Sequence, residues 1–104
     1  MHAMTRTFTG KGAAELVKLL ISRKSEVEKL MRSVPGLVSY DLIETAEGLL
    51  TITVCKDKAG TDKSLSLAKD WLKANAAHLG ISAPVVAEGK VAVHLRSDVA
   101  AAAG

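Results

Sequence analysis

The chain of 104 residues has little of what defines several familiar classes of protein. Its single cysteine, Cys55, excludes an internal disulfide and is typical of a reducing compartment, so we expect a cytoplasmic location. The apolar runs are far shorter than the about 20 consecutive residues that a membrane-spanning helix needs. The first residues do not have the pattern of a secretory signal. We therefore expect no membrane partner.

Aromatic residues and one-sided charge are also scarce. Phe8, Tyr40 and Trp71 are the only aromatics, and the net charge is +3. The basic residues alternate with acidic ones, whereas a nucleic-acid binder usually shows a basic stripe with aromatics for stacking. This pattern predicts solvated helix faces and no nucleic-acid partner.

Length and composition indicate one ordinary domain. Hydrophobic residues make up 48% and charged residues 24% of the chain, as in soluble globular proteins. We expect a single domain over residues 1–96 and a flexible, Ala-rich tail over residues 97–104.

The order of predicted elements is more informative than the composition. Alternation, apolar stripes and turn residues predict strands at 2–9, 37–45, 49–56 and 91–96, and helices at 13–33 and 62–79. This β-α-β-β-α-β order is the α+β, ferredoxin-like arrangement, an antiparallel sheet with two helices on one face. Leu16, Leu20, Val27, Met31 and Val34 form the stripe of the first helix.

The strand at 49–56 has two different faces. Leu50, Ile52 and Val54 share one face, and Thr51, Thr53 and Cys55 share the other. We expect the aliphatic face to lie beneath the helices. The Thr/Thr/Cys face would then be open to a ligand or a second subunit. Because an exposed sheet face favours aggregation, we expect a homodimer through this open face.

With these elements in place, the chain resembles the antibiotic-biosynthesis-monooxygenase superfamily of dimeric α+β barrels. The segments that carry the resemblance are 34–40 (VPGLVSY), 48–54 (GLLTITV), the charged loop 56–58 and 68–75 (AKDWLKAN). The resemblance implies two sheets that face each other in a dimer and enclose a cavity. Members include cofactor-free oxygenases of polycyclic substrates, heme-degrading enzymes and proteins without known activity.

Two groups of polar residues are candidate sites. Trp71, Asn75 and His78 fall on one flank of the second helix. Heme-degrading relatives use a Trp and a His on this helix and an Asn on the first strand. Trp71 matches, His78 matches loosely in spacing, and the first strand carries Thr5 and Thr7 in place of the Asn.

The second group would converge from the strands. His94 and Arg6 on the terminal strands could face one cavity with the side chains of the central pair, namely Ser39, Asp41, Thr51 and Thr53. His94 would be a general base for a phenol or enol, with Asp41 or Arg6 as helper. The alternative is a polar dimer interface. Cys55 on the same face would be a buried thiol or a ligand contact.

The resemblance implies a homodimeric α+β barrel protein that, if it is an enzyme, is a cofactor-independent monooxygenase acting on an electron-rich aromatic or polyketide-like molecule; we expect no cofactor and no metal. Three histidines without Cys/His spacing predict no metal site. One alternative is a non-catalytic module, stress-related or binding a small apolar or aromatic ligand. Another is a heme binder that uses His78.

Overall fold

A computed structural model describes residues 1–97 of the chain. Residues 98–104, on which most of the predicted flexible tail falls, lie outside the described residues. The elements follow the order β1 (His2–Thr9), α1 (Ala13–Ser22), α2 (Lys24–Arg32), β2 (Leu37–Thr45), β3 (Gly48–Cys55), α3 (Lys58–Asn75), a 3-10 turn η1 (Ala77–Leu79) and β4 (Val85–Lys90).

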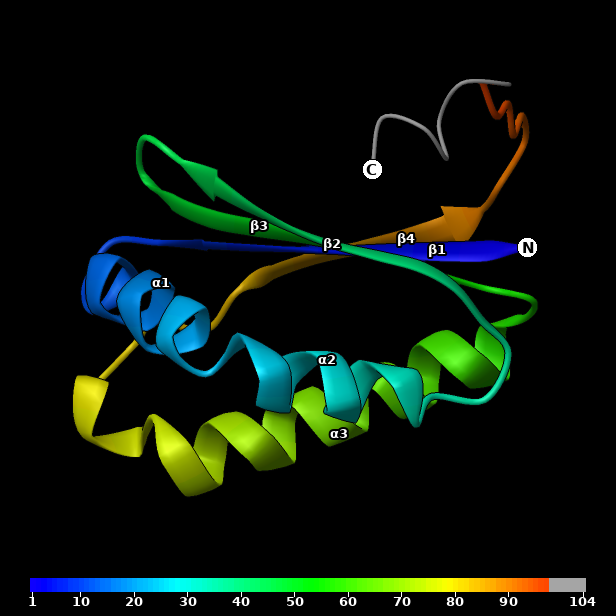
Figure 1. The fold of residues 1–104 in the computed structure, drawn as a ribbon. Coiled ribbons are helices and arrows are strands. Elements are labelled where there is room, and N and C mark those ends of the chain that lie inside the picture. Colours follow the sequence, from blue (N-terminus) through cyan, green and yellow to red (C-terminus); the bar gives the residue numbers. More distant parts are fainter. Residues whose placement is uncertain (98–104) are drawn as a thin grey trace.

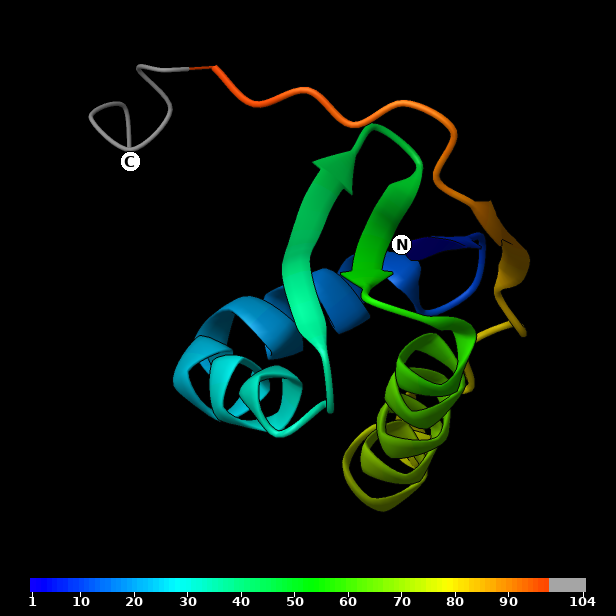
Figure 2. The same cartoon turned by 90° about the vertical axis from the view of Figure 1, so that its right-hand side faces the viewer.

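The four strands form one antiparallel sheet in the order β2-β3-β1-β4. All helices lie on one face of this sheet (Figure 1). Figure 2 shows α1 with α2 on one side and α3 on the other, beneath the strands. The predicted α+β, ferredoxin-like fold is confirmed.

The predicted helix 13–33 is two helices. Arg23 separates α1 from α2, with a non-helical backbone at φ −115° and ψ 29°. The apolar stripe continues across the break, since Leu16, Leu20 and Met31 are buried and Val27 is half-buried. The break therefore turns the chain without changing the face that packs on the sheet.

The last strand lies earlier than predicted. Residues 85–90 pair with β1 in an antiparallel register, from Thr7 opposite Val85 to His2 opposite Lys90. The predicted strand at 91–96 is wrong, because the segment has no strand pairing and its alternating Val93 and Leu95 are exposed. Alternation alone did not distinguish it from the preceding segment Val85–Lys90, which forms the strand.

The predicted assignment of the two faces of β3 is also wrong. Leu49, Thr51, Thr53 and Cys55 are buried on the helix side, while Leu50, Ile52 and Val54 point to the open face. The register explains the reversal, because β1 places its buried residues opposite those of β3, with Phe8 opposite Leu49. Large side chains from β1 and the helices fill the helix side, so small Thr residues fit there.

The core has two parts beneath the sheet. One surrounds Phe8, Leu16 and Leu49, and the other surrounds Met31, Val34 and Cys55. Among residues 1–97, no helix is long and apolar enough to cross a membrane.

Candidate functional site

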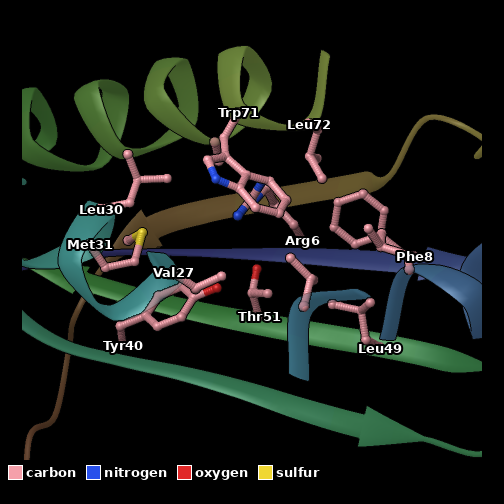
Figure 3. A pocket seen from close by; sticks show the side chains of 13 residues that line it. Arg6, Phe8, Val27, Leu30, Met31, Tyr40, Leu49, Thr51, Trp71 and Leu72 are labelled. Atoms are coloured by element: carbon pink, nitrogen blue, oxygen red, sulfur yellow. The ribbon is translucent and has the colours of Figure 1, made fainter. Parts of the chain in front are cut away.

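A small cavity lies between the helices and the sheet, where the two parts of the core meet. This inner cavity has a volume of about 30 Å³, room for about two water molecules. Phe8, Leu49 and Leu72 are among its apolar walls, and Trp71 of α3 reaches over it (Figure 3). Its polar lining consists of Arg6, Thr51 and Tyr40 from three adjacent strands.

Arg6 is the most unusual member of this lining. The residue is only 5% exposed, yet its Nε–H has no hydrogen-bond partner among the described residues. Its guanidinium carbon lies 5.7 Å from the centroid of the Phe8 ring. Burial lowers the pKa of Arg6, but an arginine keeps its charge in proteins. The site therefore holds a buried cation with aromatic contact and no ion-pair partner in residues 1–97.

Two threonines beside Arg6 are also unpartnered. Thr51 lies directly opposite Arg6 in the register, and Thr53 lies two residues further along β3, opposite Met4. Their Oγ atoms are buried without a hydrogen-bond partner within residues 1–97. Thr51 lines the inner cavity, and its hydroxyl points into it (Figure 3). Because unpaired buried polar groups are rare in folded proteins, their concentration here makes this part of the sheet a candidate site.

Tyr40 separates the inner cavity from a groove at the surface. This side groove has a volume of about 280 Å³ and lies between α1, α2 and β2. Leu20, Val27 and Tyr40 line both spaces. Burial raises the pKa of Tyr40, an effect that the Arg6 guanidinium opposes, so its hydroxyl stays protonated and can donate a hydrogen bond.

A second polar group, which we call the Arg23 cluster, connects the α1–α2 pair with α3 and consists of Arg23, Glu26, Trp71 and Asn75. Arg23, at the break between α1 and α2, donates to Glu26 at 2.6 and 2.7 Å and to Oδ1 of Asn75 at 2.9 Å. Its guanidinium lies 5.0 Å from the Trp71 ring centroid, and Trp71 Nε1–H donates to Glu26 at 3.2 Å. The cluster thus fixes the indole that covers the inner cavity.

The strand residues predicted to converge do not all meet. Arg6, Thr51 and Thr53 lie on the helix side, whereas Ser39 and Asp41 are exposed on the other face of the sheet. The register decides this, because side chains alternate and Ser39 and Asp41 oppose the outward Val54 and Ile52. The prediction of one shared cavity is therefore wrong, while Arg6 and Thr51 do meet.

The predicted histidine positions are exposed. His94 lies in the segment after β4, away from the residues that line the inner cavity, and His78 lies on η1. Of the flank predicted on the second helix, Trp71 lines the cavity and Asn75 supports it through Arg23. Within residues 1–97, no three His, Cys, Asp or Glu side chains gather in a way that could hold a metal ion.

Cys55 is part of the core rather than of the cavity. Its side chain is 0% exposed and packs near Met31 and Val34. Burial, and to a lesser degree the carboxylate of Asp57, raises the pKa of the thiol. A raised pKa lowers the thiolate fraction, so the geometry agrees with a buried, unreactive thiol.

Sequence reasoning missed Tyr40, Arg23 and Glu26 as site residues. Tyr40 could have been found from its place two residues before Leu42, on the same face of β2 as that half-buried residue. Arg23 and Glu26 carried no such signal, since their approach to Trp71 depends on the helix break.

The chain is similar to several solved structures of other proteins. No family model matches the chain, and no curated protein matches it. Among solved structures, a protein of unknown function from Nitrosomonas europaea has 20% identity and a TM-score of 0.65, with 92% of each chain covered. The monooxygenase ActVA-Orf6 of Streptomyces coelicolor, solved with the ligand nanaomycin D, has 16% identity, a TM-score of 0.61 and 92% coverage of each chain.

A dimeric ferredoxin-like protein from an uncultured marine organism is similar too. It has 14% identity and a TM-score of 0.63, and the match covers 92% of this chain and 96% of that one. At such identities the likeness shows a shared fold. The resemblance predicted from the sequence is confirmed at that level: the chain has the ferredoxin-like fold of the antibiotic-biosynthesis-monooxygenase-like proteins.

Proposed function

We propose that the inner cavity and the side groove form one binding site for a small aromatic molecule, and that the protein oxygenates this molecule without a cofactor. The observation that carries the proposal is the buried, unpaired Arg6 and Thr51 within apolar walls. A site with mostly apolar walls and a few convergent polar groups is typical of small-ligand binding. The fold shared with a monooxygenase supports the reaction class.

The chemistry needs a stabilised anion more than it needs a protein base. Arg6 would favour the phenolate or enolate form of a bound substrate, because the attraction between opposite charges is stronger in a site that holds little water. Such an anion is electron-rich enough to react with dioxygen. A ring CH₂ becomes C=O, one oxygen atom is retained, and the other leaves as water with the two hydrogens of the CH₂.

Space for the substrate comes from joining the two hollows. The inner cavity is smaller than a benzene-sized cavity of about 150 Å³, while the side groove has about 280 Å³. Leu20, Val27 and Tyr40 form the shared wall. A rotation of Tyr40 toward solvent would connect them, so that the ring system lies in the groove and its oxygen reaches Arg6.

The base roles predicted for His94 and Asp41 have no geometric support in this proposal. No carboxylate or histidine lines the inner cavity within residues 1–97. The substrate proton would leave to water through the side groove. The same observation favours a second candidate function, in which the site binds its ligand without turnover.

We also propose a homodimer through the open sheet face. Its outward side chains include the aliphatic Leu50, Ile52 and Val54, with the 40% exposed Ile43 beside them, as well as the polar Ser39 and Asp41. No helix covers this face in the described part of the chain (Figure 1). Burying such a face against a second copy removes its apolar area from water. A dimeric protein of the same fold supports the arrangement.

Oxygen uptake tests the proposed activity. With a dihydroxynaphthalene or anthrone substrate under ¹⁸O₂, we expect oxygen consumption and one ¹⁸O atom in the product. Arg6→Met should abolish turnover, whereas Arg96→Met, which removes an equal charge from an exposed site, should not. Ligand-induced change of Trp71 fluorescence without oxygen uptake would establish the binding function instead, and the absence of both would refute the site.

A further inference from the structure

We propose that Arg6 and Thr51 form an anion-binding subsite that selects aromatic monocarboxylates as ligands of the inner cavity. This inference rests on the proposed function, because it names the class of molecule that the same site takes. In such a ligand the carboxylate takes the place beside Arg6 that the ring oxygen takes in a phenolic substrate, so the carboxylate is the inner end of the ligand and the aromatic ring the outer end.

The orphaned atom of Arg6 indicates the shape of the anion. A guanidinium presents Nε–H and one Nη–H along one edge, and this edge matches the two oxygens of a carboxylate. Nε is the atom of Arg6 that is buried and unpartnered. Leaving a buried charge unpaired is unfavourable, so an anion that meets this edge gains more than it would at an exposed arginine.

Thr51 supplies a further donor at the same place. It opposes Arg6 in the β1–β3 register, its residue is 2% exposed, and its Oγ has no hydrogen-bond partner within residues 1–97. Figure 3 shows Arg6, Thr51 and Tyr40 rising from the sheet toward the helices. Tyr40, whose hydroxyl stays protonated, lines both the inner cavity and the side groove from which the ligand would enter.

The rest of the lining limits the charge and the body of the ligand. Arg6 is the single cation that lines the inner cavity within residues 1–97, so a monoanion is matched and a dianion such as phosphate is not. Beyond Arg6, Thr51 and Tyr40 the cavity lining is apolar or aromatic, and it includes Phe8, Leu49, Leu72 and Trp71. These walls favour an aromatic body over a sugar or a peptide.

Calorimetric titration with 2-naphthoate and its neutral analogue 2-naphthamide tests the inference. We expect the acid to bind the wild-type protein at least about 10-fold more tightly than the amide, as for a charged hydrogen bond. Arg6→Met should weaken binding of the acid by roughly 100-fold, as expected when one partner of a buried charge pair is removed. Binding of the amide should be unchanged. Arg96→Met serves as the charge-matched control.

Two further variants keep the test decisive if Arg6→Met does not fold. Arg6→Lys keeps the charge but loses the two-pronged edge, and Thr51→Val removes the hydroxyl; each should weaken 2-naphthoate by about 10-fold. Equal binding of acid and amide to the wild type overturns the inference and leaves the proposed site standing. Binding of neither compound, together with no oxygen uptake from the neutral substrates, overturns both.

Discussion

Replacing Thr53 by valine should stabilise the protein, although Thr53 lies in the core. The residue is 1% exposed and its Oγ has no hydrogen-bond partner in residues 1–97. Valine has nearly the same shape and puts a methyl group where the hydroxyl was. The variant therefore keeps the packing against Met4 and Tyr40, its neighbours across the sheet, and removes a buried polar atom.

The expected gain follows from the unpaired hydroxyl. An unsatisfied buried polar group costs about 1–3 kcal/mol, and we take the lower end, about 1 kcal/mol, for a small hydroxyl that can turn. For a chain of this length, that gain raises the midpoint of thermal unfolding by about 4–8 °C. Thr51→Val should give less, because Thr51 lines the inner cavity, where a water molecule can pair with its hydroxyl.

Equilibrium unfolding in urea, followed by the fluorescence of Trp71, measures this difference. Wild type, Thr53→Val and Thr51→Val are compared at one protein concentration, since association contributes to apparent stability. Thr45→Val, at an exposed position of β2, is the control and should change the free energy by less than about 0.5 kcal/mol. A loss of stability in Thr53→Val would refute the reasoning and indicate that its hydroxyl is paired.

Three other perturbations test separate parts of the structure. Hydrogen bonds from Arg23 lower the pKa of Glu26, so their stabilisation is present above the unfolded pKa of about 4.3 and is lost as pH falls through the lowered value. Between pH 7 and 3, the midpoint of thermal unfolding should fall more steeply for wild type than for Glu26→Gln. Parallel curves of midpoint against pH would contradict this. Gly60→Ala should cost about 2 kcal/mol or more, because its Cβ would lie 2.7 Å from Cys55 Cβ. A Cβ added at Gly89 would have no atom within 4 Å, so Gly89→Ala should be tolerated. Equal denaturation midpoints for Gly60→Ala and Gly89→Ala would contradict this prediction. Ile52→Asp, on the open face, should halve the mass measured by light scattering; an unchanged mass would exclude that interface.

Much of the fold was predictable because the local sequence patterns of the strands and helices agree with the way these elements pack in the whole domain. The strands at 2–9 and 37–45 lie where alternation placed them. The stripe through Leu16, Leu20 and Met31 faces the sheet as expected. The break at Arg23 was not predictable, because the stripe continues through it and no glycine or proline marks it.

The faces of the sheet could not be assigned from strand composition. Leu50, Ile52 and Val54 form the more apolar row, and the usual rule places such a row in the core. The row is instead on the open face, as is possible when both faces of a sheet are to be buried. A one-residue change of register moves every side chain to the other face. This reversal also explains why Asp41 lies on the open face and not in the cavity toward which it was predicted to point.

Part of the candidate site was nevertheless identified. Trp71 and Arg6 were both predicted as site residues, and both line the inner cavity. They were placed in different groups, because the approach of α3 to β1 is a tertiary contact. His94 was placed with them by an assumed strand that the chain does not form.

The central claim is that Arg6 holds the acidic end of an aromatic ligand inside the cavity. The most direct test is the ¹H–¹⁵N signal of the Arg6 Nε–H group, assigned by its loss in Arg6→Lys, during titration with 2-naphthoate. The account predicts a saturable downfield proton shift of this signal, which 2-naphthamide does not produce. A signal that stays in place while 2-naphthoate binds elsewhere on the protein would contradict it.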